Sequence, residues 1–184
     1  MSFLNIFINI DQSVANFFYI SRNIELIKIF TIITFFGEWQ IVAGMAIIFS
    51  FILLLYKKKM YILSLWITLI GSGIFSSIGK LIFHRLRPDT AFYIEDSFSF
   101  PSGHATIAIA FYGFVIFFLC QMIKKREYKI CILFLGLILI FAIGFSRLYL
   151  GVHFLSDVCA GYFLGAFWLF VGIIILKWLQ HRKV

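Results

Sequence analysis

Residues 130–150 read ICILFLGLILIFAIGFSRLYL, and the first sixteen of these positions carry no charged side chain. A helix rises about 1.5 Å per residue, so about 20 such residues cross the roughly 30 Å hydrocarbon core of a bilayer. The whole chain has the same character: 62% of its 184 residues are hydrophobic, 13% are charged, and the mean hydropathy is +1.03. This composition is too apolar for a soluble domain and predicts an all-α integral membrane protein.

Apolar runs of this length recur along the chain and predict five membrane-spanning helices. The runs cover Trp39–Tyr56, Met60–Phe83, His104–Ile123, Ile130–Leu150 and His153–Leu179. No linker, repeat or low-complexity tract divides the sequence, so we expect one compact bundle. The prediction is therefore a single membrane domain, residues 1–184, with its transmembrane core in residues 39–179.

The segment before these spans, residues 1–36, has a different pattern. Asn5, Asn9, Gln12 and Asn16 interrupt its apolar residues at helical spacing. A polar stripe of this kind is typical of amphipathic helices that lie in the membrane interface. We expect one or two such helices, and the alternative is a first helix that spans the membrane and makes six spans.

Charge separates the two ends of the predicted spans. One end has a single acid, Glu127, and many basic residues, namely Lys57, Lys58, Lys59, Lys124, Lys125, Arg126, Lys129, Lys177, Arg182 and Lys183. Cytoplasmic loops are enriched in Lys and Arg, so this end is predicted to face the cytoplasm and the other end to face outward. Insertion into a membrane thus explains the net charge of +8 better than nucleic-acid binding does.

Four polar side chains come at the end of the quoted run and shortly after it: Ser146, Arg147, His153 and Asp157. His153 and Asp157 are four residues apart and would share one face of a helix, where the carboxylate can orient the imidazole. An imidazole held in one tautomer is prepared to act as a base or nucleophile. Arg147 adds a planar cation suited to phosphate. The alternative is a helix-end His–Asp pair, with Arg147 at the membrane surface.

Two further motifs are predicted at the same membrane face. Lys80 and Arg87 are seven residues apart and would project from one helix face, before Pro88 stops the helix. The sequence Pro-Ser-Gly-His at 101–104 opens a predicted span, where free N–H groups and the helix dipole favour an anion. Taken alone, the first motif is also typical of cations that reach the headgroups, and the second of an ordinary helix start.

Together, the three motifs predict a phosphoryl-transfer site. The topology brings to one membrane face a set of phosphate donors, namely Lys80, Arg87, Ser102, Gly103 and Arg147. Positive and neutral donors are what the oxygens of a phosphoryl group in transfer require. Two histidines, His104 and His153, are then left for proton transfer and attack.

The three motifs resemble the signature blocks of the type 2 phosphatidic acid phosphatase family of membrane lipid phosphatases. The blocks are Lys80 to Arg87-Pro88, Pro101-Ser102-Gly103-His104, and Ser146-Arg147 through His153 to Asp157, and the resemblance extends from Gly37 to the C-terminus. It implies that His153 forms a phosphohistidine, that Asp157 orients His153 and that His104 protonates the leaving oxygen. It also implies that the five donors hold the phosphate, and it implies no metal and no other cofactor.

The resemblance further implies a multi-pass protein of the bacterial cytoplasmic membrane that acts on a membrane lipid, with its site facing the periplasm or exterior. Short family members that act on undecaprenyl pyrophosphate are similarly compact, so this lipid is our first expectation for the substrate. Phosphatidylglycerophosphate, phosphatidic acid and lipid A phosphates are the alternatives. One departure is that the first helix of six-span relatives is missing here or reduced to Phe3–Ile10.

Two other classes of protein fit the sequence less well. A b-type haem protein could use His104 and His153 as axial ligands, but both lie at predicted span ends beside cations rather than deep in the spans. A small anion transporter could use the same cations, but the sequence shows no inverted repeat and no broken mid-membrane helix. These features favour an enzyme.

Overall fold

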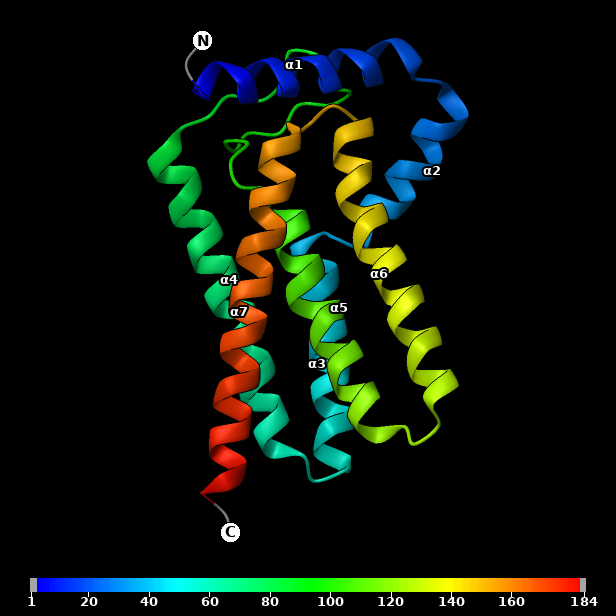
Figure 1. The fold of residues 1–184 in the computed structure, drawn as a ribbon, viewed down its shortest axis with the longest axis vertical. Helices are drawn as coiled ribbons and strands as arrows, with labels where there is room; N and C mark the ends of the chain where they lie inside the picture. The colour runs from blue at the N-terminus through cyan, green and yellow to red at the C-terminus, as the bar shows by residue number, and fades with distance from the viewer. Residues whose placement is uncertain (1–2, 183–184) are drawn as a thin grey trace.

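The computed structural model describes residues 3–182, so Lys183 of the predicted cytoplasmic cluster lies outside the described residues. The helices are α1 (Phe3–Ser21), α2 (Ile24–Phe35), α3 (Trp39–Leu55), α4 (Lys59–Phe83), α5 (Gly103–Met122), α6 (Arg126–Tyr149) and α7 (Leu155–His181). The helices from α3 onward run along the long axis of the molecule, while α1 lies across one end of them (Figure 1). This arrangement confirms the predicted all-α membrane bundle.

The predicted spans agree with the helices except at the first one. Helices α4 to α7 are each long and apolar enough to cross a membrane, and α2 and α3, bent by 45°, pass the same test together as one broken span. The count is therefore four, or five with the broken pair. Helix α2, expected in the interface, instead packs along α6, because its only charged residues are Glu25 and Lys28 in its first turns. The sequence predicted a boundary before Trp39, but it did not reveal that α2 joins α3 in one broken span.

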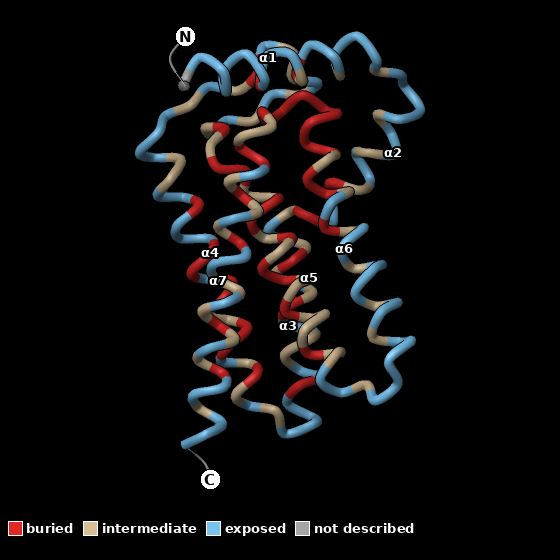
Figure 2. The backbone as a smooth tube through the Cα atoms, viewed as in Figure 1, coloured by how far each residue is buried: buried red, intermediate tan, exposed pale blue. Residues whose placement is uncertain are grey.

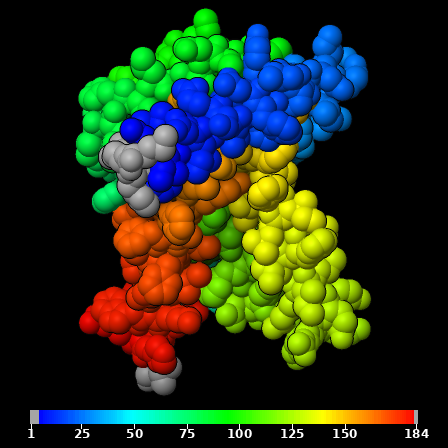
Figure 3. Space-filling view, turned by 45° about the horizontal axis from the view of Figure 1, so that its top comes forward, coloured from blue at the N-terminus to red at the C-terminus, as the bar shows by residue number. Residues whose placement is uncertain are grey.

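Helix α1 lies over the end of the bundle as an interfacial helix would (Figures 1 and 3). Its side chains Phe17, Tyr19 and Ile20 are exposed, whereas Asp11 and Ala15 are buried against the helices beneath. This placement agrees with the amphipathic pattern of the sequence. It also brings a carboxylate of α1 into the interior of the molecule.

Small residues allow α7 to pack closely on α4 and α5. A side chain at Gly165 would overlap the carbonyl oxygen of Thr106 on α5, so the two backbones approach as only glycine permits. On α4, the Ser64 hydroxyl donates to the carbonyl of Gly172 at 2.7 Å. This packing aligns the first turns of α5 and α7, where the Ser102 N–H donates to the carbonyl of Asp157 at 3.0 Å.

Buried residues gather along the centre of the bundle and at the end that α1 covers (Figure 2). At that end they include polar and charged side chains, namely Asp11, Ser99, Ser102, Ser146, Arg147, His153 and Asp157. Burial of such groups costs free energy unless partners compensate it. A cluster of them at one end of a membrane protein is therefore the place to look for function.

Candidate active site

The Lys80–Arg87 motif converges through a loop rather than along one helix face. Helix α4 ends at Phe83, and His84 takes a left-handed conformation with a φ of 46°, so Arg87 lies in the following loop. The prediction that both cations project from one helix was wrong. Both nevertheless reach the same point, because Lys80 Nζ donates to the Phe98 carbonyl at 2.8 Å and Arg87 Nε donates to the Ser97 carbonyl at 2.8 Å.

The turn between α6 and α7 carries His153. Gly151 has a φ of +67°, which favours glycine, and it reverses the chain within a few residues. Helix α7 begins at Leu155, so His153 precedes it and does not share a helix face with Asp157, as the spacing predicted. The two side chains still face one another, with His153 Nδ1 at 3.6 Å from Asp157 Oδ2. Asp157 Oδ2 accepts a hydrogen bond from the Phe154 N–H at 2.8 Å.

The buried imidazole of His153 presents its other nitrogen to a cation. Arg87 Nη1 lies 3.2 Å from His153 Nε2, and also donates to the Val152 carbonyl at 2.7 Å. A guanidinium can only donate, so Nε2 is an acceptor in this contact and the ring proton belongs on Nδ1. That tautomer directs the Nδ1 proton toward Asp157 and leaves a lone pair on Nε2.

Arg147 is fully buried and is bound by a carboxylate that the sequence did not predict as a partner. Its guanidinium donates to the Thr34 hydroxyl at 2.8 Å and pairs with Glu95. Glu95 also pairs with Arg87 at 2.6 Å. Burial acts to raise the pKa of Glu95, but Arg147 and Arg87 lower it below its usual value, so the carboxylate is ionised. Glu95 therefore bridges two of the predicted phosphate-binding cations.

The first turn of α5 supplies the remaining predicted donors. Ser102 is the N-cap residue just before this helix, and its buried hydroxyl oxygen has no hydrogen-bond partner among the described residues. A cavity of about 310 Å³ lies beside this turn, and its lining includes Lys80, Glu95, Gly103, His104 and His153. Arg87 and Arg147 do not line this cavity but pair with its lining residue Glu95. Ser102 is next in sequence to the lining residue Gly103, and Asp157 contacts the lining residue His153. The structure thus brings all three motifs to one cavity.

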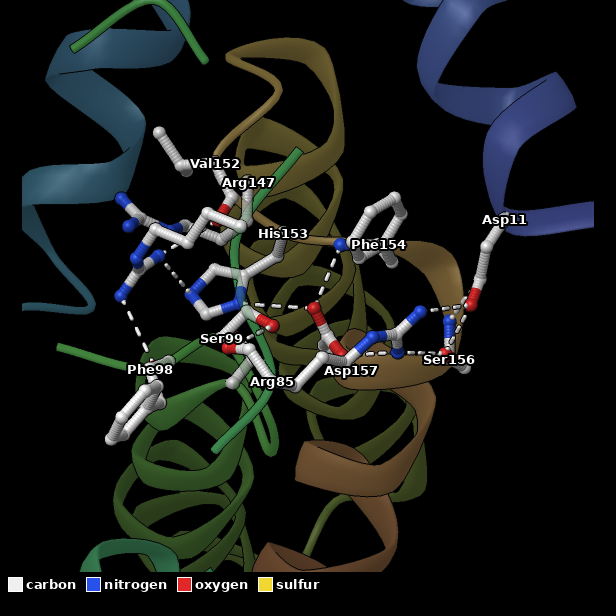
Figure 4. Close-up of polar contacts among 12 residues, drawn as sticks. Asp11, Arg85, Phe98, Ser99, Arg147, Val152, His153, Phe154, Ser156 and Asp157 are labelled. Carbon is white, nitrogen blue, oxygen red and sulfur yellow. Dashed lines mark hydrogen bonds and ion pairs between the residues drawn. The ribbon is translucent and has the colours of Figure 1, made fainter. Parts of the chain in front are cut away.

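A second group of polar contacts lies behind His153, and the sequence did not predict it. Arg85 contacts Asp157 on one side and Asp11 of α1 on the other, and Ser156 joins them (Figure 4). Arg85 could have been suspected, because it lies inside the Lys80–Arg87 motif. Asp11 had one sequence signal, since it is the only charged residue in the sequence of α1.

Burial lowers the pKa of His153 well below its usual value, and the neighbouring cations Arg147 and Arg87 lower it further. The ordinary pKa of histidine is about 6.5, so His153 is neutral at neutral pH. The sequence left the balance between Asp157 and the cations open. In the structure, burial and the cations dominate.

This pKa shift predicts the acid side of the pH profile. If neutral His153 is the attacking group, its protonation stops the reaction, and the lowered pKa moves that loss to a pH below about 6.5. We expect protonation of His153 to reduce kcat/KM only below about pH 6.5. Initial rates in a series of overlapping buffers would measure this. An acid limb centred above about pH 6.5 would contradict the prediction.

Among residues 3–182, no group of three or more His, Cys, Asp or Glu side chains is placed to hold a metal ion. The cavity has Lys80 and Glu95 in its lining, and Glu95 pairs with Arg87 and Arg147. Cations of this kind are suited to the oxygens of a phosphate. The arrangement can therefore bind an anionic group beside two imidazoles.

Known proteins resemble this chain across the whole bundle. The model of the PAP2 superfamily matches residues 60–181. Phosphatidylglycerophosphatase B of Bacillus subtilis (strain 168) is 30% identical over 158 residues, which are 84% of this chain and 77% of that protein. Undecaprenyl-diphosphatase of Sulfolobus acidocaldarius is 29% identical over 130 residues, 66% of this chain and 59% of that protein. A crystal structure of a transmembrane PAP2 type phosphatidylglycerolphosphate phosphatase from Bacillus subtilis matches with a TM-score of 0.83 and 27% identity, over 94% of this chain and 85% of that chain.

Proposed function

Because the chain belongs to the PAP2 superfamily and is a membrane lipid phosphatase, we propose that its cavity holds the phosphate of a lipid while His153 attacks the phosphorus atom. The observation that carries this assignment is the position of His153 Nε2. This nitrogen is unprotonated, so its lone pair can attack once it turns from Arg87, which lies 3.2 Å away, and it belongs to a residue that lines the same cavity as Lys80 and His104. Nucleophile, cation and second imidazole thus meet at one place.

The reaction follows in two steps. In the first, His153 Nε2 forms a bond to phosphorus, the bond from phosphorus to the lipid oxygen breaks, and His104 gives that oxygen a proton. Asp157 faces the Nδ1 proton and stabilises the positive charge that develops on the ring. In the second step, the oxygen of a water molecule forms a bond to phosphorus, the bond from phosphorus to His153 Nε2 breaks and its electron pair returns to the ring, His104 takes a proton from this water, and inorganic phosphate leaves. The Lys and Arg side chains stabilise the charge on the phosphoryl oxygens in both steps.

Arg87 and Arg147 can hold a phosphate only by exchanging their present partner for it. Glu95 occupies both guanidinium groups, and Lys80 donates to the Ser97 hydroxyl at 3.0 Å. A phosphate carries more charge and more acceptor oxygens than one carboxylate, so it can displace Glu95 from the two arginines.

The substrate is proposed from the relatives. Phosphatidylglycerophosphate is favoured, because the relative named for it covers more of this chain at higher identity than the one named for undecaprenyl pyrophosphate. Undecaprenyl pyrophosphate, the first expectation from the sequence, is the second candidate. Phosphatidic acid and lipid A phosphates complete the set to be compared.

Phosphate release from a panel of these lipids, in detergent and excess EDTA, tests the proposal. We expect release without added metal, with the largest kcat/KM for phosphatidylglycerophosphate. Reactions that contain two of the lipids at equal concentration would rank their kcat/KM values directly. Release that stops in EDTA and returns with magnesium would contradict the metal-free assignment, and release from none of the lipids would overturn the proposed function.

We further propose that this protein lies in a bacterial cytoplasmic membrane with the cavity facing outward. The cavity lies at the end of the bundle that α1 covers, and the described basic cluster lies at the opposite end, where α7 also ends (Figure 1). The positive-inside rule then places that opposite end in the cytoplasm.

Cysteine labelling in intact cells tests this orientation. After replacement of the three native cysteines, which are free, Asp96→Cys on the exposed cavity loop should react with a membrane-impermeant maleimide, and Lys125→Cys should react only after lysis. The two variants control for one another. Labelling of Lys125→Cys alone in intact cells would show that the orientation is the opposite of the proposed one.

A further inference from the structure

Arg85 is a cation at the cavity end of the bundle that the proposed phosphate site does not use. It lies between two carboxylates, with Nη1 at 2.6 Å from Asp157 Oδ1 and Nη2 at 2.7 Å from Asp11 Oδ2 (Figure 4). Its guanidinium also lies over the ring of Phe154, 4.2 Å from the centroid. One side chain thus connects helix α1 to the carboxylate behind His153.

Asp11 is bound from two directions. Its Oδ1 accepts the backbone N–H of Ser156 at 2.9 Å, and its Oδ2 accepts the Ser156 hydroxyl at 2.6 Å as well as Arg85. Asp11 is only 3% exposed. Carboxylates are favoured at the first turn of a helix, and here α1 provides one to the first turn of α7. Asp11 therefore fixes both Arg85 and the helix start that carries Asp157.

The contacts of Asp157 show what Arg85 controls. Oδ1 accepts from Arg85, while Oδ2 accepts from the Phe154 N–H at 2.8 Å and faces His153 Nδ1 at 3.6 Å. With both oxygens held, the carboxylate cannot rotate, so its position relative to the imidazole depends on Arg85. Arg85 itself is 27% exposed and could turn toward water without its second partner.

We propose that Asp11 and Arg85 are positioning residues for the nucleophile. Asp11 holds Arg85, Arg85 holds Asp157, and Asp157 orients the ring of His153. This proposal rests on the proposed function, because it concerns the same reaction. Its new content is that α1, which lies outside the three motifs, sets the rate of attack through one carboxylate.

A double-mutant cycle in the full-length protein tests the order of these contacts. Loss of the outer partner that orients a metal-binding side chain typically costs about 10- to 100-fold in activity, and we expect the same scale for an oriented nucleophile. Asp11→Ala should lower kcat about 10-fold and Arg85→Ala about 100-fold, each with KM changed less than about twofold. Because Asp11 acts mainly through Arg85, the double variant should be slower than Arg85→Ala by much less than the factor that Asp11→Ala causes alone.

Arg85→Ala removes the partner of the buried Asp157. If this variant fails to fold for that reason, conservative variants still test the proposal. Asp11→Glu should recover most of kcat, because it retains the carboxylate. Arg85→Lys should recover little, because one ammonium cannot bridge two carboxylates as the planar guanidinium does. Full recovery by Arg85→Lys would overturn the bridging role.

Two controls separate positioning from general loosening of the N-terminal segment. Glu25→Ala removes an exposed acid, paired with Lys28 at 3.0 Å, and should leave kcat unchanged. Arg22→Ala removes a second attachment of this segment, a hydrogen bond to the Tyr149 carbonyl at 3.0 Å. The fold-loss of kcat caused by Arg22→Ala should multiply with the fold-loss caused by Arg85→Ala, because Arg22 and Arg85 do not share a partner.

Distinct outcomes would contradict distinct parts of the proposal. Effects of Asp11→Ala and Arg85→Ala that multiply would show independent roles, and a rise in KM at constant kcat would assign them to substrate binding. Single variants as fast as the active wild type would overturn the positioning role alone. A wild-type protein that releases no phosphate from any lipid would overturn the proposed function and this proposal with it.

Discussion

Replacement of His153 by alanine is expected to reduce turnover by more than about 10⁴-fold, because removal of a nucleophile leaves only binding and charge stabilisation. The side chain is buried, but it lies in a turn before α7 and contacts the cavity, so the helices should still assemble. Product inhibition by phosphate should change little, since the cations remain. Steady-state phosphate release would measure the loss.

Two further variants make the result specific to His153. His153→Gln retains a polar side chain of similar size and should be as inactive as His153→Ala. His181→Ala, an exposed histidine near the C-terminal end of α7, should keep full turnover. The bound label should be labile in acid and stable in base. Radioactive phosphate that binds the wild type with this stability, and is absent from both His153 variants, would support the phosphohistidine. Turnover of His153→Ala within about tenfold of the wild type would exclude His153 as the nucleophile.

Replacement of His104 by alanine is expected to reduce turnover of a lipid phosphate by about 10²- to 10⁴-fold, the usual contribution of a general acid. A lipid alkoxide is a poor leaving group and needs the proton, whereas a nitrophenolate leaves without one. We therefore expect the loss to shrink to about 10-fold or less with p-nitrophenyl phosphate. His104 lines the cavity beside Lys80, so its imidazole is in reach of a bound ester.

The slope of log kcat/KM against the pKa of the leaving group provides the measurement for His104. A series of substituted phenyl phosphates should give a steeper slope for His104→Ala than for the wild type. The difference should disappear for the most acidic phenols. Equal losses across the series would show that His104 binds the phosphate or supports the fold rather than donating the proton.

The architecture and much of the site could be predicted from the sequence because both depend on local patterns. Apolar runs predict α4 to α7, and the ends of these runs bring Lys80, His104 and His153 to one membrane face. The chemistry of the side chains then predicts an anion site. The backbone details behind two contacts were wrong, since Arg87 and His153 lie in loops rather than on helices.

Other contacts could not be predicted, because they join segments with no shared pattern. Arg85 and Asp11 are 74 residues apart, and Arg147 and Glu95 are 52 apart, so neither pair follows a helical period. The joining of α2 to α3 in one broken span was also not predicted, although the two helices are together apolar enough to cross a membrane. Each of these features depends on how helices pack, which a single sequence does not specify.

The bridge of Glu95 between Arg87 and Arg147 means that the protein carries its own counter-ion at this site. Two guanidinium groups close together at the edge of a low-dielectric membrane would repel one another strongly if nothing lay between them. Here the side chain of a loop residue offsets part of their charge. Under the proposed function, phosphate binding would therefore exchange one anion for another, and its free energy would be a difference between two strong attractions. The same exchange would run in reverse after hydrolysis, when the carboxylate competes with free phosphate for the arginines, so Glu95 would connect product release to the return of the bridged arrangement.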